Sequence, residues 1–357
     1  MSEPIIYLAA TGHGFGHAVR VASVASVIQK LCPESVLILA TTAPRWLLDS
    51  YIEGDFIHRP RAFDVGVIQA DSLQMDKVAT LEKMQEIYAQ QRSLIASDVN
   101  FLLTNRVGVI LADIPPLMTA IAQKAGIPCY MMSNFGWDFV YRSWGEPFAE
   151  ITRQIEQNYQ ECDRLFRFPL SESMSVFPHI TDVGLTGGDP RYGESELRQQ
   201  FGLNKSPEKT VLLTFGGLGL QAIPYSNLEK FPDWQFITFD RNAPDSSNLI
   251  KITDNQYRPV DFMPLCGRVF SKPGFSTFAE ALRLEIPVIS LTRDDFSEAE
   301  VLLTGLQDYS YHQIVTPKDF FETKWEFLEM PLTPPRKAEK LDKHGAEAIA
   351  ETILNLF

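Results

Sequence analysis

The sequence predicts an α/β protein made of two doubly wound domains, each a parallel sheet covered by helices. Its 357 residues are too many for one ordinary hydrophobic core. Short apolar, β-prone runs alternate with segments of helical period, which is typical of a parallel sheet flanked by helices. A glycine- and proline-rich break, GLTGGDPR at residues 184–191, interrupts this alternation near the middle of the chain and is expected to be a linker.

The first half of the chain carries four apolar runs that read as buried strands. Their near-continuous apolarity fits strands that are covered on both faces. We expect strands at residues 5–10, 35–41, 107–112 and 128–132, and helices at residues 17–31, 76–96 and 117–125.

The alternation restarts after the break, so a second domain of the same class is expected. The predicted strands are residues 210–215, 235–239, 249–252, 268–271 and 287–291, and the predicted helices are residues 277–284 and 297–306. Three prolines make residues 330–336 extended, and a last helix should cover residues 337–356. We therefore expect domains at 1–187 and 188–336 facing a central cleft, with a C-terminal segment, 337–357, packing back on the first domain.

Charge and cysteine usage limit the function classes. There are 32 Lys and Arg residues against 45 Asp and Glu, a net charge of -13, which disfavours binding to nucleic acid or to an anionic membrane. The four scattered cysteines form no C-x-x-C pair, and this favours a reducing compartment. No signal peptide and no apolar run of about 18 residues is seen, so a cytoplasmic protein without stable membrane anchoring is expected; a homodimer is left open.

The strongest local signal is TGHGFGHAVR at residues 11–20, between the first predicted strand and its helix. Its glycines permit a tight turn, and the backbone N–H groups at the helix start favour a phosphate. A dinucleotide motif is not formed, because G-x-G-x-x-G would need glycine where His17 stands. We expect Gly14, Phe15 and Gly16 to lie beside the diphosphate of a donor.

The two histidines of this loop are candidates for chemistry. A neutral imidazole at a helix start can act as a general base, and we assign this role to His17; the alternative is a histidine that only hydrogen-bonds to the loop. His13 is expected on the acceptor side. A metal bound by both histidines would need both on one helix, which the glycines oppose, so no metal is expected.

Further polar and aromatic residues follow the predicted strands of the first domain. Asp113, Asn134 and Trp137 come at or after strand ends, where an acceptor would lie, and a sugar ring can stack on the indole. Asp138 is a second candidate base. The alternative for all four is a structural turn around a buried aromatic residue.

The second domain has glycine turns of its own. Gly216 and Gly217 follow the strand at 210–215, and FSKPGFSTFAEAL at 270–282 places a turn at Gly274 before a helix capped by Ser276 or Thr277. Glu280 would then bind ribose hydroxyls, or form a capping box with Thr277 as N-cap, or both. The acid-rich stretch at 292–301 offers Asp294 and Glu298 to sugar hydroxyls, or is a solvated helix start.

Together these motifs resemble the GT-B glycosyltransferases. The glycine-histidine loop, the mid-chain glycine turn and the G-x-S/T-x-x-E helix are similar to the peptidoglycan N-acetylglucosaminyltransferase group of family 28. A closer resemblance is to the glycosyltransferase-like N-terminal half of plant L-arabinokinase. It is carried by the glycine-histidine loop and by IQADSLQMDKVATLE, LADIPP, SNFGWDFVY, TFGG, KPGFSTFAEAL and RDDFSEAE.

This resemblance implies a GT-B fold, a donor diphosphate at the glycine turns and a ribose-binding role for Glu280. Glu298 matches an acidic position, but Ala299 stands where arabinokinase has a second Glu. The Gln-x-x-Asn stretch that grips the donor sugar in the peptidoglycan group is missing, so donor identity is not implied. The glycine-serine ATP loop of the sugar kinase is not found, so kinase activity is not expected.

We therefore expect inverting transfer from a nucleoside-diphosphate sugar, most simply a UDP-sugar, to a hydroxyl acceptor, without a cofactor. Three alternatives stay open. Gly16, His17 and Arg20 also resemble the G-H-x-x-R motif of the UDP-sugar hydrolase of pseudaminic acid synthesis. A nucleotide-sugar epimerase and a non-catalytic sugar-nucleotide sensor are the other two.

Overall fold

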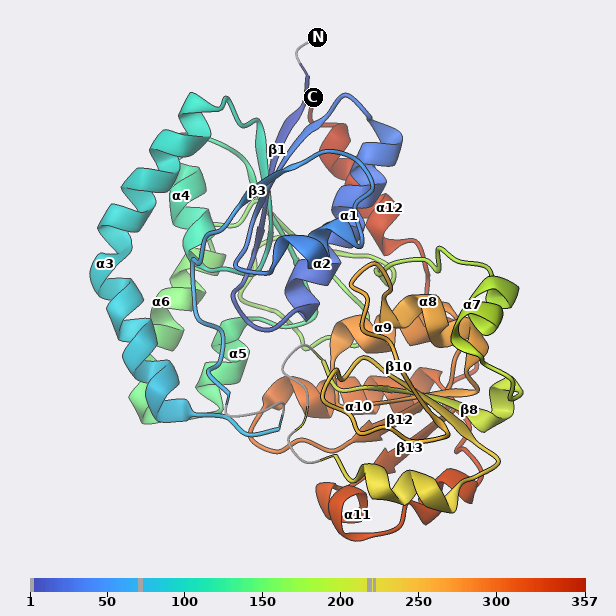
Figure 1. Ribbon diagram of the computed structural model, residues 1–357. Helices are drawn as coiled ribbons and strands as arrows, with labels where there is room; N and C mark the ends of the chain where they lie inside the picture. Colours follow the sequence, from blue (N-terminus) through green and yellow to red (C-terminus); the bar gives the residue numbers. More distant parts are fainter. Residues whose placement is uncertain (1–2, 70–72, 217–219, 221–222) are drawn as a thin grey trace. The chain divides into compact units, whose positions relative to one another are not determined.

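The computed structural model describes residues 3–69, 73–216, 220 and 223–357. These residues divide into two compact units (Figure 1). Unit 1 contains the described residues up to 69, together with Met75–Gly187 and Asp342–Phe357. Unit 2 contains Leu73, Gln74 and the described part of Gly188–Leu341.

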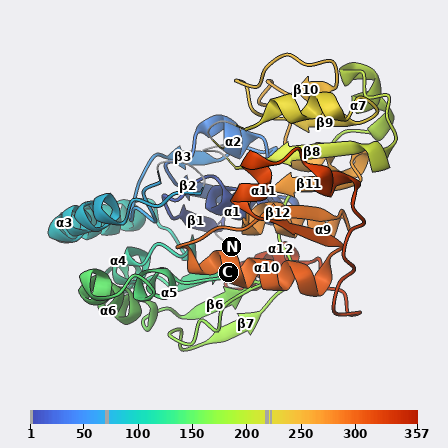
Figure 2. The same ribbon diagram turned by 90° about the horizontal axis from the view of Figure 1, so that it is seen from below.

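Unit 1 is a seven-stranded parallel sheet in the order β3-β2-β1-β4-β5-β6-β7, with β3 and β7 at its two edges (Figure 2). Its strands are β1 (Ile5–Ala10), β2 (Val36–Ala40), β3 (Ile57–Arg59), β4 (Val109–Asp113), β5 (Cys129–Ser133), β6 (Arg164–Arg167) and β7 (Ile180–Asp182). All residues of β4 are buried, which explains its unbroken apolar run.

Helices cover this sheet. They are α1 (Gly16–Leu31), α2 (Arg45–Asp49), α3 (Lys77–Thr104), α4 (Leu117–Ala125), α5 (Trp137–Arg142), α6 (Ala149–Tyr159) and α12 (Gly345–Leu354), with a 3-10 turn η1 (Glu146–Phe148). The long α3 runs beside α4, and α12 packs on α1 (Figure 1). Small residues such as Ala18, Ala22 and Ala25 on the buried face of α1 allow this close packing.

Unit 2 is a six-stranded parallel sheet in the order β10-β9-β8-β11-β12-β13. Its strands are β8 (Thr210–Thr214), β9 (Gln235–Thr238), β10 (Leu249–Lys251), β11 (Arg268–Ser271), β12 (Val288–Leu291) and β13 (His312–Val315). Its helices are α7 (Glu194–Phe201), α8 (Pro259–Phe262), α9 (Phe275–Arg283), α10 (Ser297–Tyr309) and α11 (Pro317–Glu322), with 3-10 turns η2 (Pro207–Lys209), η3 (Tyr225–Lys230), η4 (Met263–Leu265) and η5 (Glu326–Glu329).

An aromatic cluster forms part of the core of unit 2. Phe270 of β11 contacts the rings of Phe215, Phe320 and Trp325 at centroid distances of 5.5, 5.3 and 5.6 Å. All four residues are buried. This cluster fixes the end of β8 beside β11, where the candidate nucleotide-binding turns begin.

Both sheets have a topological switch point. In unit 1 the chain adds strands on one side of β1 and then crosses to β4 on its other side; in unit 2 it does the same around β8 and β11. Ligands of doubly wound proteins bind at the carboxyl ends of the strands that flank such a point. The registers Ala10 with Asp113 and Thr214 with Ser271 bring the loops after these strands together within each unit.

The end of the chain differs from the expectation. The predicted helix at 337–356 begins only at Gly345, and residues 337–341 belong to unit 2. The reason is tertiary hydrogen bonding: the Lys337 N–H donates to the Asp308 carbonyl at 2.9 Å, and the Leu185 N–H donates to the Asp342 carbonyl at 2.7 Å. A backbone used in this way cannot continue a helix.

Candidate active site

The glycine-histidine loop leaves the carboxyl end of β1 and enters α1 at the switch point of unit 1. Phe15 is the N-cap of α1 and makes no side-chain cap hydrogen bond. Gly14 has a φ of +63°, in the left-handed region that glycine adopts without strain. Helix α1 begins at Gly16, so His17 lies in its first turn.

His17 contacts a carboxylate at the end of β4. Its Nδ1 lies 2.9 Å from Oδ1 of Asp113. Asp113 is completely buried and His17 is 5% exposed. Strand register explains the pairing, because Asp113 stands beside Ala10, the residue before the loop.

Arg20, one helical turn after His17, binds the same carboxylate. Its Nε donates to Asp113 Oδ2 at 2.7 Å and its Nη2 to Oδ1 at 2.9 Å, while Nη1 donates to Asn134 Oδ1 at 2.6 Å. Such a bidentate pair is strong and geometrically specific. It joins α1, β4 and the loop after β5 into one polar cluster.

The guanidinium restricts the tautomer of His17. Nη2 of Arg20 lies 2.5 Å from His17 Nδ1, which also contacts Asp113. Arginine only donates and a carboxylate only accepts, so Nδ1 can satisfy one of them at a time. If Nδ1 carries the proton and donates to Asp113, Nε2 keeps a lone pair and can act as a base. If Nδ1 accepts from Arg20, Nε2 carries the proton and cannot.

A second buried carboxylate holds the start of the loop. Asp64 accepts the Gly12 N–H at 2.9 Å and also accepts a hydrogen bond from the Thr11 hydroxyl. Trp137 Nε1 donates to Thr11 Oγ1 at 3.1 Å. Burial raises the pKa of Asp64, and its hydrogen bonds from Thr11 and Gly12 oppose that rise.

Aromatic rings line this cluster. The indole of Trp137 lies edge-on to His13 at 5.3 Å and to Phe135 at 5.1 Å, and 6.0 Å from His17. His13 Nδ1 lies 3.2 Å from both the carbonyl oxygen and the amide nitrogen of Val67. Unit 1 thus brings together the predicted residues His13, His17, Asp113, Asn134 and Trp137.

Asp138 occupies a different environment. It is 3% exposed, and its Oδ2 accepts from Arg142 at 2.9 Å. Among the contacts within the described chain, none joins it to His17. Burial, followed by the nearby charge of Glu172, raises its pKa to about 6. Its role as a second base stays a prediction.

The raised pKa of Asp138 predicts a stability change with pH. Because the folded state holds the Asp138 proton more tightly than the unfolded state, this group contributes stability that is fully present below about pH 4 and is lost as pH rises through 6. This rise in the pKa of Asp138 corresponds to a contribution of roughly 3 kcal/mol to the free energy of unfolding. Thermal unfolding of Asp138→Asn from pH 4 to 8 should show a flatter curve than wild type. Parallel curves would contradict this.

The switch point of unit 2 places a cation beside a glycine turn. Gly216 follows β8, is exposed and has a φ of +80°. A Cβ on Gly216 would lie 3.1 Å from Cε and 3.7 Å from Nζ of Lys272, the residue after β11. Lys272 was not among the residues predicted from the sequence, although it belongs to the KPGFSTFAEAL motif. Gly217 lies outside the described residues.

The start of α9 corrects the predicted capping. Gly274 is the N-cap and α9 begins at Phe275, so neither Ser276 nor Thr277 is the N-cap. Glu280 consequently lies beyond the first turn, and the capping-box interpretation is wrong. The backbone at this cap is extended, with φ -165° and ψ 122°, and no side chain caps the helix.

Glu280 instead contacts the chain at the start of unit 2. Its Oε1 accepts the Gly188 N–H at 3.1 Å, and it is 4% exposed. Arg283 donates to the Gly188 carbonyl at 3.1 Å and to Asp189 Oδ1 at 2.8 Å. One face of α9 therefore anchors residues 188–189. The ribose-binding role of Glu280 stays a prediction.

The acid-rich segment splits into an exposed and a buried part. Asp294 is exposed before α10, whereas Glu298 is 8% exposed in its first turn. The guanidinium of Arg293 lies over the ring of Phe296 at 4.3 Å. Of the two residues predicted to contact the sugar, Asp294 is therefore the more accessible.

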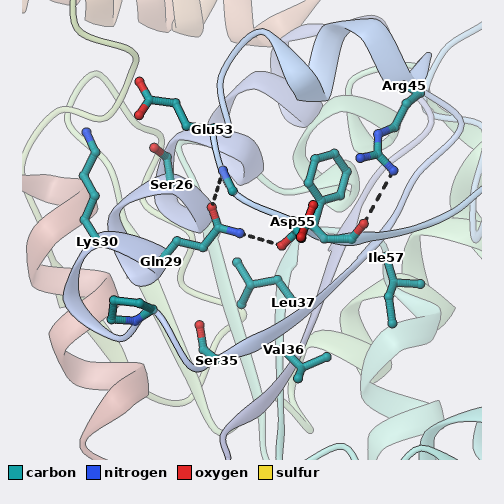
Figure 3. A pocket seen from close by; sticks show the side chains of 13 residues that line it. Ser26, Gln29, Lys30, Ser35, Val36, Leu37, Arg45, Glu53, Asp55 and Ile57 are labelled. Atoms are coloured by element: carbon teal, nitrogen blue, oxygen red, sulfur yellow. Dashed lines mark hydrogen bonds between the residues drawn. The ribbon is translucent and has the colours of Figure 1, made fainter.

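One cavity of unit 1 lies elsewhere. Its volume is about 770 Å³, and it lies between the end of α1, the start of β2 and the start of β3. Figure 3 shows side chains that line it, among them Gln29, which is hydrogen-bonded to the backbone of Gly54 and Asp55. It lies at the amino ends of these strands, whereas His17 and Asp113 lie at the carboxyl edge. None of the predicted site residues lines it.

The described residues contain neither a membrane-spanning helix nor a metal-binding cluster. No helix there is both long and apolar enough to span a membrane. No group of three or more His, Cys, Asp or Glu side chains there is placed to hold a metal ion. The ring centroids of His13 and His17 are 6.2 Å apart.

No protein-family model matches the chain. It is 28% identical over 325 residues to L-arabinokinase of Arabidopsis thaliana, a match that covers 88% of this chain and 31% of that protein. The chain thus spans about a third of the length of this relative.

Solved structures of glycosyltransferases superpose on the whole chain. A UDP-glucosyltransferase from Polygonum tinctorium has a TM-score of 0.65 at 12% identity and covers 100% of this chain and 94% of its own. Arabidopsis thaliana UGT89C1 complexed with UDP-L-rhamnose gives 0.59 at 13%, covering 99% and 94%. SnogD from Streptomyces nogalater gives 0.57 at 13%, covering 100% of both chains. With its two parallel sheets, the chain has the GT-B glycosyltransferase fold, and most of this chain is similar to part of L-arabinokinase.

Proposed function

We propose that the protein transfers a sugar from a nucleoside-diphosphate sugar to a hydroxyl acceptor, with His17 as general base. The observation that carries the proposal is the contact of His17 Nδ1 with buried Asp113 at the switch point of unit 1. An imidazole held this way on one nitrogen presents the other to a substrate proton. We further propose a UDP-sugar donor, because neighbours of the same fold are complexed with UDP-L-rhamnose and UDP-2fluoro-glucose.

The reaction is a single displacement. The acceptor O–H gives its proton to Nε2 of His17, and its oxygen forms a bond to the anomeric carbon of the donor. The bond from that carbon to the diphosphate oxygen breaks, and the electron pair leaves with the diphosphate. One displacement inverts the anomeric carbon.

Each unit supplies one part of this chemistry. Unit 1 holds the base, with His13, Asn134 and Trp137 as proposed acceptor-side residues and Gly14, Phe15 and Gly16 as proposed diphosphate-binding backbone. Unit 2 binds the donor through its glycine turn and the start of α9, with Lys272 as a cation for the diphosphate. Gly274, Ser276, Thr277 and Glu280 would contact the nucleotide, and Asp294 and Glu298 the sugar. The proposed reaction uses these groups and assigns no role to a metal.

The proposal is tested by nucleotide release. The protein is incubated with UDP-, GDP- and ADP-sugars, with and without hydroxyl acceptors, and free nucleotide is followed. Release that depends on acceptor supports transfer. Release without acceptor indicates a hydrolase, and binding without release, unchanged in His17→Ala, indicates a sensor; either result overturns the proposal.

Lys272 provides a test of donor binding. Lys272→Met should raise KM for the donor about 10-fold with a smaller effect on kcat, because a cation beside the Gly216 turn is lost. The matched control is Lys251→Met, which removes a lysine paired with exposed Asp245. Steady-state kinetics at fixed ionic strength measure both. Equal donor KM values in the two variants would rule out a diphosphate contact for Lys272.

A further inference from the structure

Asp64 connects the segment after β3 to the start of the glycine-histidine loop and, through Thr11, to the Trp137 indole. It lies in the segment after β3 and is 5% exposed. One carboxylate oxygen accepts the Gly12 N–H and the other the Thr11 hydroxyl, so it holds the first two residues of the loop that carries His13 and His17. Thr11 Oγ1 accepts from Trp137 Nε1 at 3.1 Å. The chain of bonds therefore runs from Asp64 through Thr11 to the acceptor-side indole.

The segment around Asp64 also packs tightly against the site. Gly66 has a φ of +59°, and a Cβ there would lie 2.3 Å from His13 Cβ and 3.0 Å from the Trp137 ring. The Tyr141 hydroxyl donates to the Gly66 carbonyl. Residues 64–67 thus contact the glycine-histidine loop on one side and the aromatic residues Trp137 and Tyr141 on the other. This packing leaves Asp64 little freedom to move.

Charge gives Asp64 a second effect. The charge of Asp113 is largely matched by its bidentate pair with Arg20. No Lys or Arg forms an ion pair with Asp64 among the described residues. Asp64 is therefore a second buried carboxylate that interacts electrostatically with His17 when His17 takes up the acceptor proton. The His17 charge in turn favours the ionised form of Asp64.

We infer that Asp64 is a positioning residue of this site, which fixes the start of the glycine-histidine loop and places a second buried carboxylate beside His17. This inference rests on the proposed function of His17. The ionisable groups around the two side chains are Asp113, Arg20, His13, Tyr88, Tyr141 and Tyr159.

The test compares Asp64→Asn with wild type. Asn keeps the size and one acceptor oxygen but removes the charge. We expect kcat to fall roughly 10- to 100-fold with donor KM unchanged, since misplaced groups reduce rate more than binding. The acidic limb of the kcat/KM profile should move about one pH unit lower, because loss of a negative charge disfavours protonation of the base. Hydrogen exchange of the Gly12 amide should accelerate.

A second pair of variants tests the Thr11 link without touching the carboxylate. Thr11→Val removes the hydroxyl and should lower kcat and shift the Trp137 indole N–H resonance. Thr11→Ser restores the hydroxyl and should recover most of the rate. Rescue by Ser separates positioning from loss of stability, because the smaller side chain packs less well than Val.

Asp98→Asn is the matched control. Asp98 is a buried carboxylate of unit 1, on α3, that binds Arg59 and Arg61, so its loss costs stability without touching the loop. If Asp64→Asn folds, keeps kcat within twofold of wild type and leaves the acidic limb in place, the inference is overturned. Hydrogen exchange of the Gly12 amide and the Trp137 indole resonance are measured without substrate. They therefore test the hydrogen bonds of Asp64 to Gly12 and Thr11 even if no donor is turned over and the proposed function fails.

Discussion

The Asp113→Asn protein is expected to release nucleotide about 10²- to 10⁴-fold more slowly than wild type, with donor KM nearly unchanged. The Asp113 carboxylate can only accept, so it favours a proton on His17 Nδ1 and leaves Nε2 basic. An Asn amide can instead donate to Nδ1. That donation places the proton on Nε2, where it blocks uptake of the acceptor proton.

Arg20 adds a second influence on the tautomer of His17. It competes for His17 Nδ1 from 2.5 Å, so the tautomer rests on a balance between one donor and one acceptor. Removing the acceptor tips the balance fully toward the unreactive form. The ¹⁵N shifts of the His17 ring distinguish the two tautomers directly, and kcat should follow the fraction protonated at Nδ1.

Stability must be measured in parallel, because breaking a buried ion pair costs about 3–5 kcal/mol. His17→Gln leaves the pair of Asp113 and Arg20 intact and should lose rate to a similar degree. In the double variant the losses should not add, because the two residues act as one unit. A folded Asp113→Asn protein that keeps its rate within threefold would exclude the base role of His17.

The central strands were predictable because of how they are buried. β1, β4, β8 and β11 are covered on both faces, so each reads as an apolar run. The edge and near-edge strands β3, β6 and β7 carry His58, Arg59, Arg164, Arg167 and Asp182 and are too short and polar to show this signal. Their pairing is decided by the neighbouring strand, which no local pattern reveals.

Most residues of the candidate site could be predicted from the sequence, but the contacts between them could not. Asp113 and His17 each stand where a strand meets a loop, yet their contact depends on the register of β1 with β4. Asp64 had no sequence signal, since it follows a strand that was itself missed. The capping-box interpretation of Glu280 was wrong because Gly274 is the N-cap, three residues before Thr277, so α9 starts three residues earlier than that interpretation requires.

The second large effect is expected for a substitution of Gly345, at the start of α12. Gly345→Ala should destabilise unit 1 by about 2–3 kcal/mol, at the upper end for overpacking. A Cβ on Gly345 would lie 2.0 Å from the carbonyl oxygen and 2.5 Å from the carbonyl carbon of Gly184. These are backbone atoms, so no side chain can rotate away.

The contact matters because it attaches α12 to the segment that precedes unit 2. The Gly345 N–H donates to the Leu185 carbonyl at 3.1 Å, and the Leu185 N–H donates to the Asp342 carbonyl at 2.7 Å. Relieving the clash would pull α12 from this segment and from α1, whose packing buries Ile349 and Ile353. Hydrogen exchange of α12 should therefore accelerate more than that of β8 in unit 2.

Two other glycines separate this mechanism from a general effect of alanine. Gly108→Ala also creates a contact, at 2.4 Å, but with the ring of Phe357, a terminal side chain that is 43% exposed and can move. Gly193→Ala meets nothing within 4 Å. We expect melting temperatures to fall strongly for Gly345→Ala, slightly for Gly108→Ala and not at all for Gly193→Ala. Equal melting temperatures for all three would show that the junction of α12 with residues 184–185 adjusts freely and does not hold the chain end in unit 1.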